Sequence, residues 1–404
     1  MSSGGLSRWR LARMHDVMAG YVKRGEVPGV VTLVDRRGEV HVDAIGAAAF
    51  GDSEPIRPDT IFRISSMTKP VTAVATMILV EECALRLDDP VDRLLPELAD
   101  RRVLRRLDGP PEDTVPANRP ITVRDLLTFQ MGFGIIMAPP GTYPIQELVN
   151  DTLPASQGPP EPSVPPAPDE WIRRLGTLPL LYQPGERWMY NTGSDVLGVL
   201  IARASGQPFE TFLRERIFEP LGMSDTGFSV PTAALDRLAT GYRHDPATGG
   251  LAVYDEPVGG QWSRPPAFPS GGGGLVSTAE DYLAFSRMML DNGRYPGGRL
   301  LSRPSVEIMT TDHLTPEQKA TADLLLGYFD SHGWGFGVAM ATRRDNVAES
   351  IGSYGWNGGL GTLWCADPRE QMSTILLTQC AWTSPSPPDI CRDFQTLAYQ
   401  AIDD

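Results

Sequence analysis

Patterns typical of β-strands gather near the two ends of this 404-residue chain, and helical patterns lie between them. Residues 30–35 and 40–44 are rich in β-branched side chains and are joined by Arg36-Arg37-Gly38-Glu39, which predicts a hairpin. Residues 334–340, 361–365 and 372–378 show strand-like patterns separated by glycine-rich turns. These observations favour an α+β fold in which one antiparallel sheet is built from both ends of the chain.

Helical patterns predict how the rest of the chain is organised. Amphipathic spacing of Leu6, Leu11, Met14, Met18 and Tyr21 predicts a first helix. Further helices are expected at about 66–82, 122–129, 195–204, 282–290 and 390–401. We therefore expect residues 1–85 and 325–404 to form the sheet-containing part, residues 86–324 to form a mostly helical region, and the active site to lie between them.

Three local patterns in the helical region carry more specific expectations. Ser277-Thr278-Ala279-Glu280 has the form of a capping box before the helix at 282–290. The arginines at 101, 102, 105 and 106 are expected on a solvated helix face. Residues 139–169 hold ten prolines and few apolar anchors, and two interpretations stay open for them: an ordered flap over a pocket or a mobile insertion.

Charge and composition exclude several function classes. The formal net charge is −14, and an acidic surface repels phosphate backbones and anionic lipid, so neither nucleic acid nor a membrane is an expected partner. The N-terminal segment has no apolar h-region, and the apolar run at 71–80 is too short to span a bilayer. We therefore expect a cytoplasmic protein.

No metal or other cofactor is expected from the cysteines and histidines. The four cysteines match no zinc pattern, three of them lie in apolar runs that favour core positions, and the five histidines are scattered along the chain. The cysteines are Cys83, Cys365, Cys380 and Cys391, and the histidines are His15, His41, His244, His313 and His332.

The sequence Ser66-Met67-Thr68-Lys69 is the first indication of chemistry. Residues three apart lie on one helix face, so the Ser66 hydroxyl and the Lys69 amine can meet. A serine hydroxyl needs a base to become a good nucleophile, and an amine can serve if its pKa is lowered. The chain has only three lysines among 36 Lys and Arg residues, and one of them stands at this position. The alternative is that Ser66 caps the helix and Lys69 is an exposed first-turn residue.

Four segments together resemble a known family. Residues 62–70, Phe-Arg-Ile-Ser-Ser-Met-Thr-Lys-Pro, resemble the nucleophile segment of the serine β-lactamase and penicillin-binding-protein family, above all its class C-like branch, the family VIII carboxylesterases. Residues 183–192 resemble the second motif, in which a Pro-Gly turn leads to Tyr-x-Asn. Residues 270–278 are similar to a recurrent glycine-rich segment, and residues 355–359 stand where the third motif is expected. The resemblance covers about residue 15 to the end.

The resemblance implies a fold and a set of catalytic roles. It implies a β-lactamase/transpeptidase-like fold and an acyl-enzyme formed on Ser66, with Lys69 and Tyr190 sharing the transfer of protons. Tyr190 would act near its phenolate form, so we expect Lys69 to lower its pKa. The backbone N–H groups of Ser66 and Gly359 would form the oxyanion hole. The glycines at 271–274 are interpreted as a flexible turn with no catalytic part, because no phosphate-loop pattern follows them.

Two departures from the family pattern favour ester substrates. Thr192 stands where β-lactamases and peptidases of the family have Asn, and Trp356 stands where they have Lys or His. A Trp supplies an apolar wall and one N–H but no positive charge, which disfavours anionic β-lactam or peptidoglycan substrates. We expect Trp356, Thr192, Asn357 and Gly358 to contact a small-molecule ester.

Other functions remain open at this point. Within the family the alternatives are a β-lactamase or D,D-peptidase, and an acyltransferase that uses an alcohol as acceptor. A binding or regulatory protein on the same scaffold is the non-enzyme alternative. An α/β-hydrolase is disfavoured because the chain has no G-x-S-x-G sequence. The sequence does not predict the oligomeric state.

Overall fold

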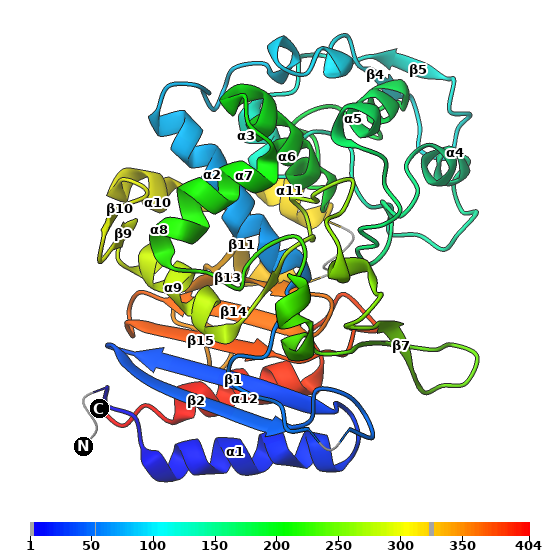
Figure 1. The fold of residues 1–404 in the computed structure, drawn as a ribbon. Coiled ribbons are helices and arrows are strands. Elements are labelled where there is room, and N and C mark those ends of the chain that lie inside the picture. The colour runs from blue at the N-terminus through cyan, green and yellow to red at the C-terminus, as the bar shows by residue number, and fades with distance from the viewer. Residues whose placement is uncertain (1–3, 53, 323–326) are drawn as a thin grey trace.

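The two ends of the chain form one seven-stranded antiparallel sheet, which confirms the predicted fold class (Figure 1). The computed structural model describes residues 4–52, 54–322 and 327–404. The strand order is β11-β12-β13-β14-β15-β1-β2, so the predicted N-terminal hairpin lies beside the last strand of the chain. The strands are β1 (Gly29–Arg36), β2 (Glu39–Gly46), β11 (His332–Trp334), β12 (Ala339–Ala341), β13 (Tyr354–Gly358), β14 (Thr362–Asp367) and β15 (Met372–Leu377).

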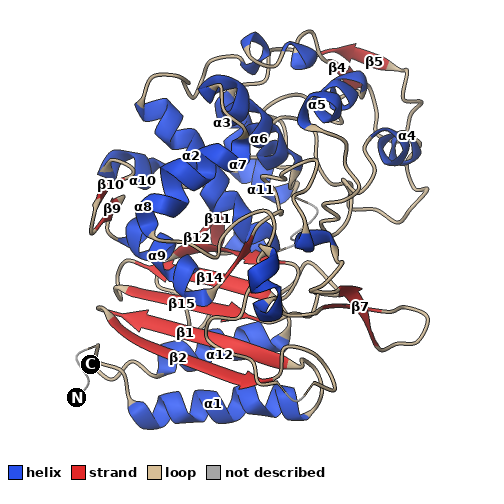
Figure 2. Ribbon diagram, viewed as in Figure 1, coloured by secondary structure: helices blue, strands red, loops and turns tan. Residues whose placement is uncertain are grey.

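Helices cover both faces of this sheet (Figure 2). Helices α1 and α12 pack on each other and on one face, and α9 packs on the other. Each of the six predicted helices is present. The helices are α1 (Arg8–Lys23), α2 (Thr68–Glu81), α3 (Val123–Leu127), α4 (Ile145–Thr152), α5 (Pro168–Thr177), α6 (Thr192–Ser205), α7 (Phe209–Leu213), α8 (Glu219–Leu221), α9 (Ala279–Leu290), α10 (Arg303–Met309), α11 (Pro316–Ala320) and α12 (Asp389–Gln400).

Strand β1 shows how the sequence specifies this layering. All eight of its residues are buried, and it pairs with β2 on one side and β15 on the other. Val30 and Val34 pack in the apolar cluster that includes α1 and α12, whereas Val31 and Leu33 pack in the large core on the opposite face. Alternate residues of a strand point to opposite faces, so an uninterrupted apolar strand fits a sheet that is covered twice.

Three local predictions are wrong. The segment 334–340 is not one strand, because a turn at Gly335–Gly337 separates β11 from β12, with the Gly335 N–H bonded to the Val338 carbonyl and a φ of 70° at Gly337. The N-cap of α9 is Thr278 instead of Ser277, and its side chain accepts from the Asp281 N–H. The arginine group lies on no helix: β4 runs over Arg102–Leu104, and Arg101 is buried.

Small two-stranded sheets occur outside the large sheet, most of them within residues 86–324. Strands pair as β3 (Phe62–Arg63) with β8 (Val276–Ser277), β4 with β5 (Thr114–Pro116), β6 (Gly241–His244) with β7 (Leu251–Asp255), and β9 (Arg294–Tyr295) with β10 (Gly298–Arg299). The proline-rich segment holds α4 and the start of α5. The predicted boundary at 324–325 lies outside the described residues, and the division into two parts stays a prediction.

The cysteines form no disulfide in this structure. All four cysteines are free, and Cys365 and Cys391 are buried in the core as small apolar residues. Within the described parts of the chain, none of the helices combines the length and the apolar character needed to cross a membrane.

Candidate active site

Ser66 lies in a short 3-10 turn, η1 (Ser65–Met67), that leads directly into α2. Ser65 has a φ of 46°, a region that non-glycine residues seldom occupy, so the backbone is strained next to Ser66. The Thr68 hydroxyl donates to the Ser65 carbonyl at 2.7 Å and accepts from the Leu275 N–H at 3.1 Å. These bonds hold the strained turn against the glycine-rich segment that precedes Leu275.

Lys69 is brought onto Ser66 as the helical spacing predicts. Its Nζ donates to Ser66 Oγ at 2.9 Å and to the Gly272 carbonyl at 2.5 Å, and the side chain is fully buried. Burial lowers the pKa of Lys69 to about 7, against the opposing effect of the Asp195 carboxylate. The alternative of an exposed first-turn lysine is therefore excluded. The interpretation of residues 271–274 as a flexible turn without a part in the site is also wrong, because this buried turn supplies an acceptor for Lys69.

Asp195 was missed by the sequence analysis. It lies on the first turn of α6, where its Oδ1 accepts from Ser270 Oγ at 2.6 Å and from the Gly272 N–H at 3.0 Å. Burial is the main cause that raises the pKa of Asp195, and the hydrogen bonds and Lys69 oppose that rise. An acidic residue at the start of an otherwise apolar helix was the available signal, but the same pattern is typical of residues that interact with a helix dipole.

Tyr190 lies beside the Ser66–Lys69 pair. The Lys69 Nζ is 4.5 Å from the centroid of its ring, and its hydroxyl is hydrogen-bonded to Ser66 and accepts from Trp356 Nε1 at 2.7 Å. The next residue, Asn191, has a φ of 84°, so the chain turns sharply before α6 begins. Burial raises the pKa of Tyr190 well above its usual value, although the bonds to Ser66 and Trp356 oppose this. The expected lowering of this pKa by Lys69 is therefore wrong, and the phenol is neutral here.

An aromatic cluster fixes the position of Tyr190. Its ring stacks on Trp188 at 5.6 Å, meets Phe129 edge-on at 5.7 Å, and lies 5.7 Å from Trp356. Trp356 in turn packs edge-on against Trp334 at 4.7 Å. Packed aromatic rings have few alternative positions, so the phenol is held in place before a substrate binds.

The end of β13 lies against the turn that carries Ser66. A Cβ on Gly358 would come within 2.2 Å of the Ile64 carbonyl, and Thr362 Oγ1 donates to the same oxygen at 3.1 Å. Glycine at 358 therefore lets the strand approach η1 closely. Gly359 follows at the rim, where a Cβ would meet nothing within 4 Å, and both Gly359 and Ser66 line the same cavity.

This cavity has a volume of about 890 Å³. Of the residues expected to contact substrate, Trp356, Thr192 and Asn357 line it, whereas Gly358 packs against Ile64 instead. The described residues that line it include neither Lys nor Arg. Its ionisable side chains are the carboxylic acids of Glu161, Asp195 and Asp345, the imidazole of His332, and the phenols of Tyr190 and Tyr328. The cavity therefore offers little to hold an anionic substrate.

The proline-rich segment forms one wall of the cavity, over residues 154–162 and 165. The Tyr254 hydroxyl donates to the Pro160 carbonyl, and Ser163 Oγ donates to Gln261 Oε1 at 2.8 Å. These bonds tie the proline-rich segment to β7 and to the turn that follows it. No local pattern in the sequence indicates these partners of the proline-rich segment.

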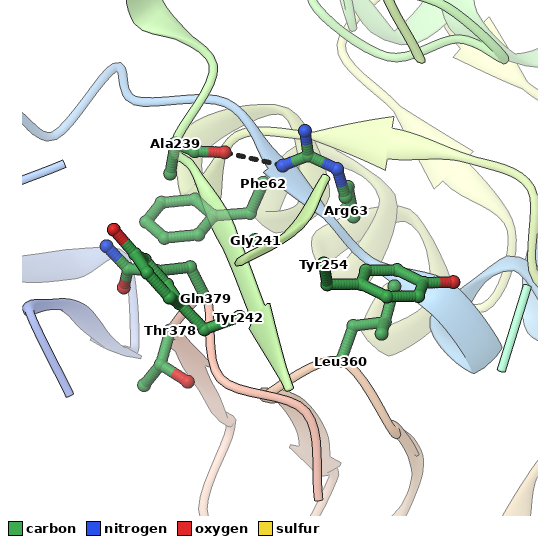
Figure 3. Close-up of a pocket in the computed structure, with 9 residues that line it drawn as sticks. All are labelled: Phe62, Arg63, Ala239, Gly241, Tyr242, Tyr254, Leu360, Thr378 and Gln379. Carbon is green, nitrogen blue, oxygen red and sulfur yellow. Dashed lines mark hydrogen bonds between the residues drawn. The ribbon is translucent and has the colours of Figure 1, made fainter. Parts of the chain in front are cut away.

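A small cavity of about 10 Å³ lies behind the strand that leads to Ser66 (Figure 3). Arg63 extends beside it and donates to the Ala239 carbonyl and, at 2.9 Å, to Asp255 Oδ2. Both members of the ion pair are buried, so removal of one would leave an uncompensated charge. The space is too small for a substrate.

Comparisons with known proteins identify the family of this chain. The sequence model of the family described as Beta-lactamase matches residues 14–391. Protein Rv1367c of Mycobacterium tuberculosis is 39% identical over 363 residues, which cover 88% of this chain and 86% of that protein. Esterase EstB of Burkholderia gladioli is 31% identical over 400 residues, which cover 93% and 92%.

A solved structure extends the comparison to the fold. EstCE1, described as a hydrolase with promiscuous acyltransferase activity, superposes with a TM-score of 0.76 and 25% identity over 98% of both chains. The family match, the relatives and the shared fold lead to one conclusion: this chain belongs to the serine β-lactamase and penicillin-binding-protein-like family of serine hydrolases, close to the family VIII carboxylesterases.

Proposed function

We propose that the protein hydrolyses uncharged carboxylic esters through an acyl-enzyme on Ser66. Ser66 Oγ attacks the carbonyl carbon while its proton passes to the neutral amine of Lys69. The oxyanion that forms faces the N–H groups of Ser66 and Gly359. When the C–O bond to the alcohol breaks, the proton returns to the leaving oxygen through the Tyr190 hydroxyl. Water then attacks the acyl-enzyme, with the same two groups accepting and returning its proton.

One observation carries this proposal: the Lys69 amine lies 2.9 Å from the Ser66 hydroxyl and is buried. A pKa of about 7 leaves a large fraction of the amine neutral near neutral pH, which is the form that can accept a proton. An exposed lysine, with its usual pKa above 10, would be almost entirely protonated.

The cavity supports an uncharged substrate. Trp356 occupies the place where a cation would hold a carboxylate, and its N–H is already donated to Tyr190. Glu161 and Asp345 line the same cavity, and their negative charges would repel an anion. A β-lactam or a peptide with a free carboxylate would therefore bind poorly, and a small-molecule ester fits better.

A comparison of two chromogenic substrates tests the proposal. We expect p-nitrophenyl butyrate to be hydrolysed with a far higher kcat/KM than nitrocefin, and Ser66→Ala to lose nearly all turnover. Lys69→Arg should be nearly as inactive, because arginine keeps the charge but cannot release its proton. A strong preference for nitrocefin would support the β-lactamase alternative. A fluorophosphonate probe that leaves the wild-type protein unlabelled would support a binding protein.

Acyl transfer to an alcohol is a second candidate, favoured by the likeness to EstCE1 with its promiscuous acyltransferase activity. The acyl-enzyme is the same, and an alcohol replaces water in the second step. Product analysis of the p-nitrophenyl butyrate reaction with added 1-butanol separates the two reactions. Butyl butyrate as the main product at a low alcohol concentration would favour the transferase, and butyrate would favour the hydrolase.

A further inference from the structure

A second cavity, of about 310 Å³, lies on the face of the sheet that α12 covers. In the β13–β14 register Asn357 faces Leu363 and Gly355 faces Cys365, and Leu363 packs in the same cluster as α12. Alternate residues point to opposite faces, so these four lie on the α12 face while Trp356 points toward the reaction cavity. We call the space between β12, β13, β14 and α12 the α12 groove.

The α12 groove and the reaction cavity share a wall. The shared residues come from separate segments that meet at the end of β13, and Asn357 lies at this meeting point on the strand that also carries Trp356. Six residues line both spaces: Tyr328, His332, Asn346, Trp356, Asn357 and Pro387. The two cavities therefore border each other at the end of β13, and a flexible chain attached to an ester at Ser66 has to cross this border to enter the groove.

The shared wall is held in place before any ligand binds. His332 stacks on Tyr328 with ring centroids 4.1 Å apart, and its Nε2 lies 3.1 Å from Glu349 Oε2. Glu349 has a φ of 61°, so this contact also fixes a sharp turn of the chain beside the groove. A preformed wall lowers the entropy lost when a flexible ligand is ordered.

The groove is suited to an aliphatic chain. Ala339, Ala341, Leu363 and Cys391 supply apolar surface, and burial raises the pKa of the Cys391 thiol to about 12, so it stays neutral. The two formal charges among the described lining residues are each engaged in the structure. Glu349 is paired with His332, and Arg392 is paired with Asp389.

We propose that the α12 groove binds the apolar tail of a long-chain ester whose carbonyl group reacts at Ser66. This inference rests on the proposed ester hydrolysis and adds the substrate class: esters with a straight aliphatic chain on either the acyl or the alcohol side. Each methylene that leaves water for the groove should raise kcat/KM about fourfold until the groove is full.

Two series of esters test the groove and show which side of the ester enters it. One series is p-nitrophenyl esters of straight-chain acids from four to fourteen carbons, and the other is butyrates of straight-chain alcohols. We expect kcat/KM to rise with chain length in one series. Thr396→Trp, on the exposed surface of α12 at the groove, should abolish this rise and leave the rate on p-nitrophenyl butyrate unchanged. Ala341→Phe fills the groove from the sheet side and should likewise abolish the rise of kcat/KM with chain length.

Ala12→Trp is the matched control, because it adds the same exposed ring to α1, which packs beside α12 but does not line the groove. It should keep the full chain-length dependence. A rise with chain length that survives both Thr396→Trp and Ala341→Phe would overturn the proposal, as would the absence of any rise in both series.

The experiments distinguish between an error in the proposed chain-binding groove and an error in the proposed ester hydrolysis. If p-nitrophenyl butyrate is not hydrolysed at all, the catalytic proposal fails. Calorimetry of 1-decanol binding to Ser66→Ala then tests whether the groove binds an aliphatic chain, independently of catalysis. We expect Thr396→Trp in the Ser66→Ala background to weaken this binding at least tenfold. Equal binding with and without the tryptophan would refute the groove.

Discussion

Lys69 and Asp195 form a small buried network in which each group depends on the other. Lys69 touches Ser66 and Gly272, and Asp195 holds the Gly272 turn through its N–H. Burial lowers the pKa of Lys69 and raises that of Asp195, and each charge offsets part of the shift of the other. A base poised near neutral pH is the result that the proposed reaction requires.

The network predicts the pH dependence of catalysis. Activity needs the neutral amine, so kcat/KM should rise with pH through an apparent pKa near 7. Asp195→Asn keeps an acceptor for Ser270 and Gly272 but removes the charge that favours protonated Lys69. The acid limb of the pH profile should therefore move to lower pH. A profile measured from pH 5 to pH 9 checks this, and an unmoved acid limb would show that Asp195 carries no charge that Lys69 senses.

The Trp356 indole should assist Tyr190 through one hydrogen bond. Trp356→Phe keeps an aromatic ring but removes the N–H that donates to the phenol at 2.7 Å, so kcat on p-nitrophenyl butyrate should fall about tenfold. Trp382→Phe is the matched control: it makes the same change in the same cavity, and its indole N–H has no partner among the described residues. Equal losses in both variants would contradict a specific role for Trp356.

At the scale of elements, the site depends on how closely β13 approaches η1. The strand reaches the turn because Gly358 has no Cβ, while its neighbour Gly359 stands free at the rim. The sequence placed the third motif here but did not predict a strand, since Gly355-Trp356-Asn357-Gly358 has too many residues that disfavour strands. The pairing of β13 with β14 over five residues overrides that weak local preference.

The two adjacent glycines give a paired test of this packing. Gly358→Ala would bring a methyl group within about 2.2 Å of Ile64 and should destabilise the protein by about 1–3 kcal/mol as strand and turn separate. Gly359→Ala adds the same methyl group to open space and should leave the free energy of unfolding nearly unchanged. Urea unfolding of both variants measures the difference. Equal stabilities would show that β13 does not press against η1.

At the scale of the whole molecule, the sequence predicted what local patterns determine. The hairpin of β1 and β2, the six helices and the approach of Lys69 to Ser66 follow from local composition, turn signals and helical spacing. Other features depend on contacts between segments that lie far apart in the sequence. Arg101 was assigned to a solvated helix face, yet it lies buried and donates to the carbonyls of Leu175 and Leu178. Such partners lie more than seventy residues away, where no local pattern reports them.

The same reason explains the errors at the site. The sequence pattern indicates that an amine lies near Tyr190, which predicts a lowered pKa. It does not indicate how completely the folded protein excludes water from the phenol. Burial by the aromatic cluster outweighs the charge. Asp195 was overlooked because its partner, the turn at Gly272, lies 77 residues further along the chain. Both effects depend on the packed fold.

Direct detection of the acyl-enzyme shows whether Ser66 is the nucleophile. The protein is mixed with p-nitrophenyl butyrate, quenched in acid within milliseconds to seconds, and analysed by mass spectrometry after digestion. We expect one butyryl group on the peptide that contains Ser66, a matching burst of p-nitrophenol, and neither in Ser66→Ala. Turnover that persists in Ser66→Ala, or a butyryl group on another residue that appears at the rate of turnover, would contradict this expectation.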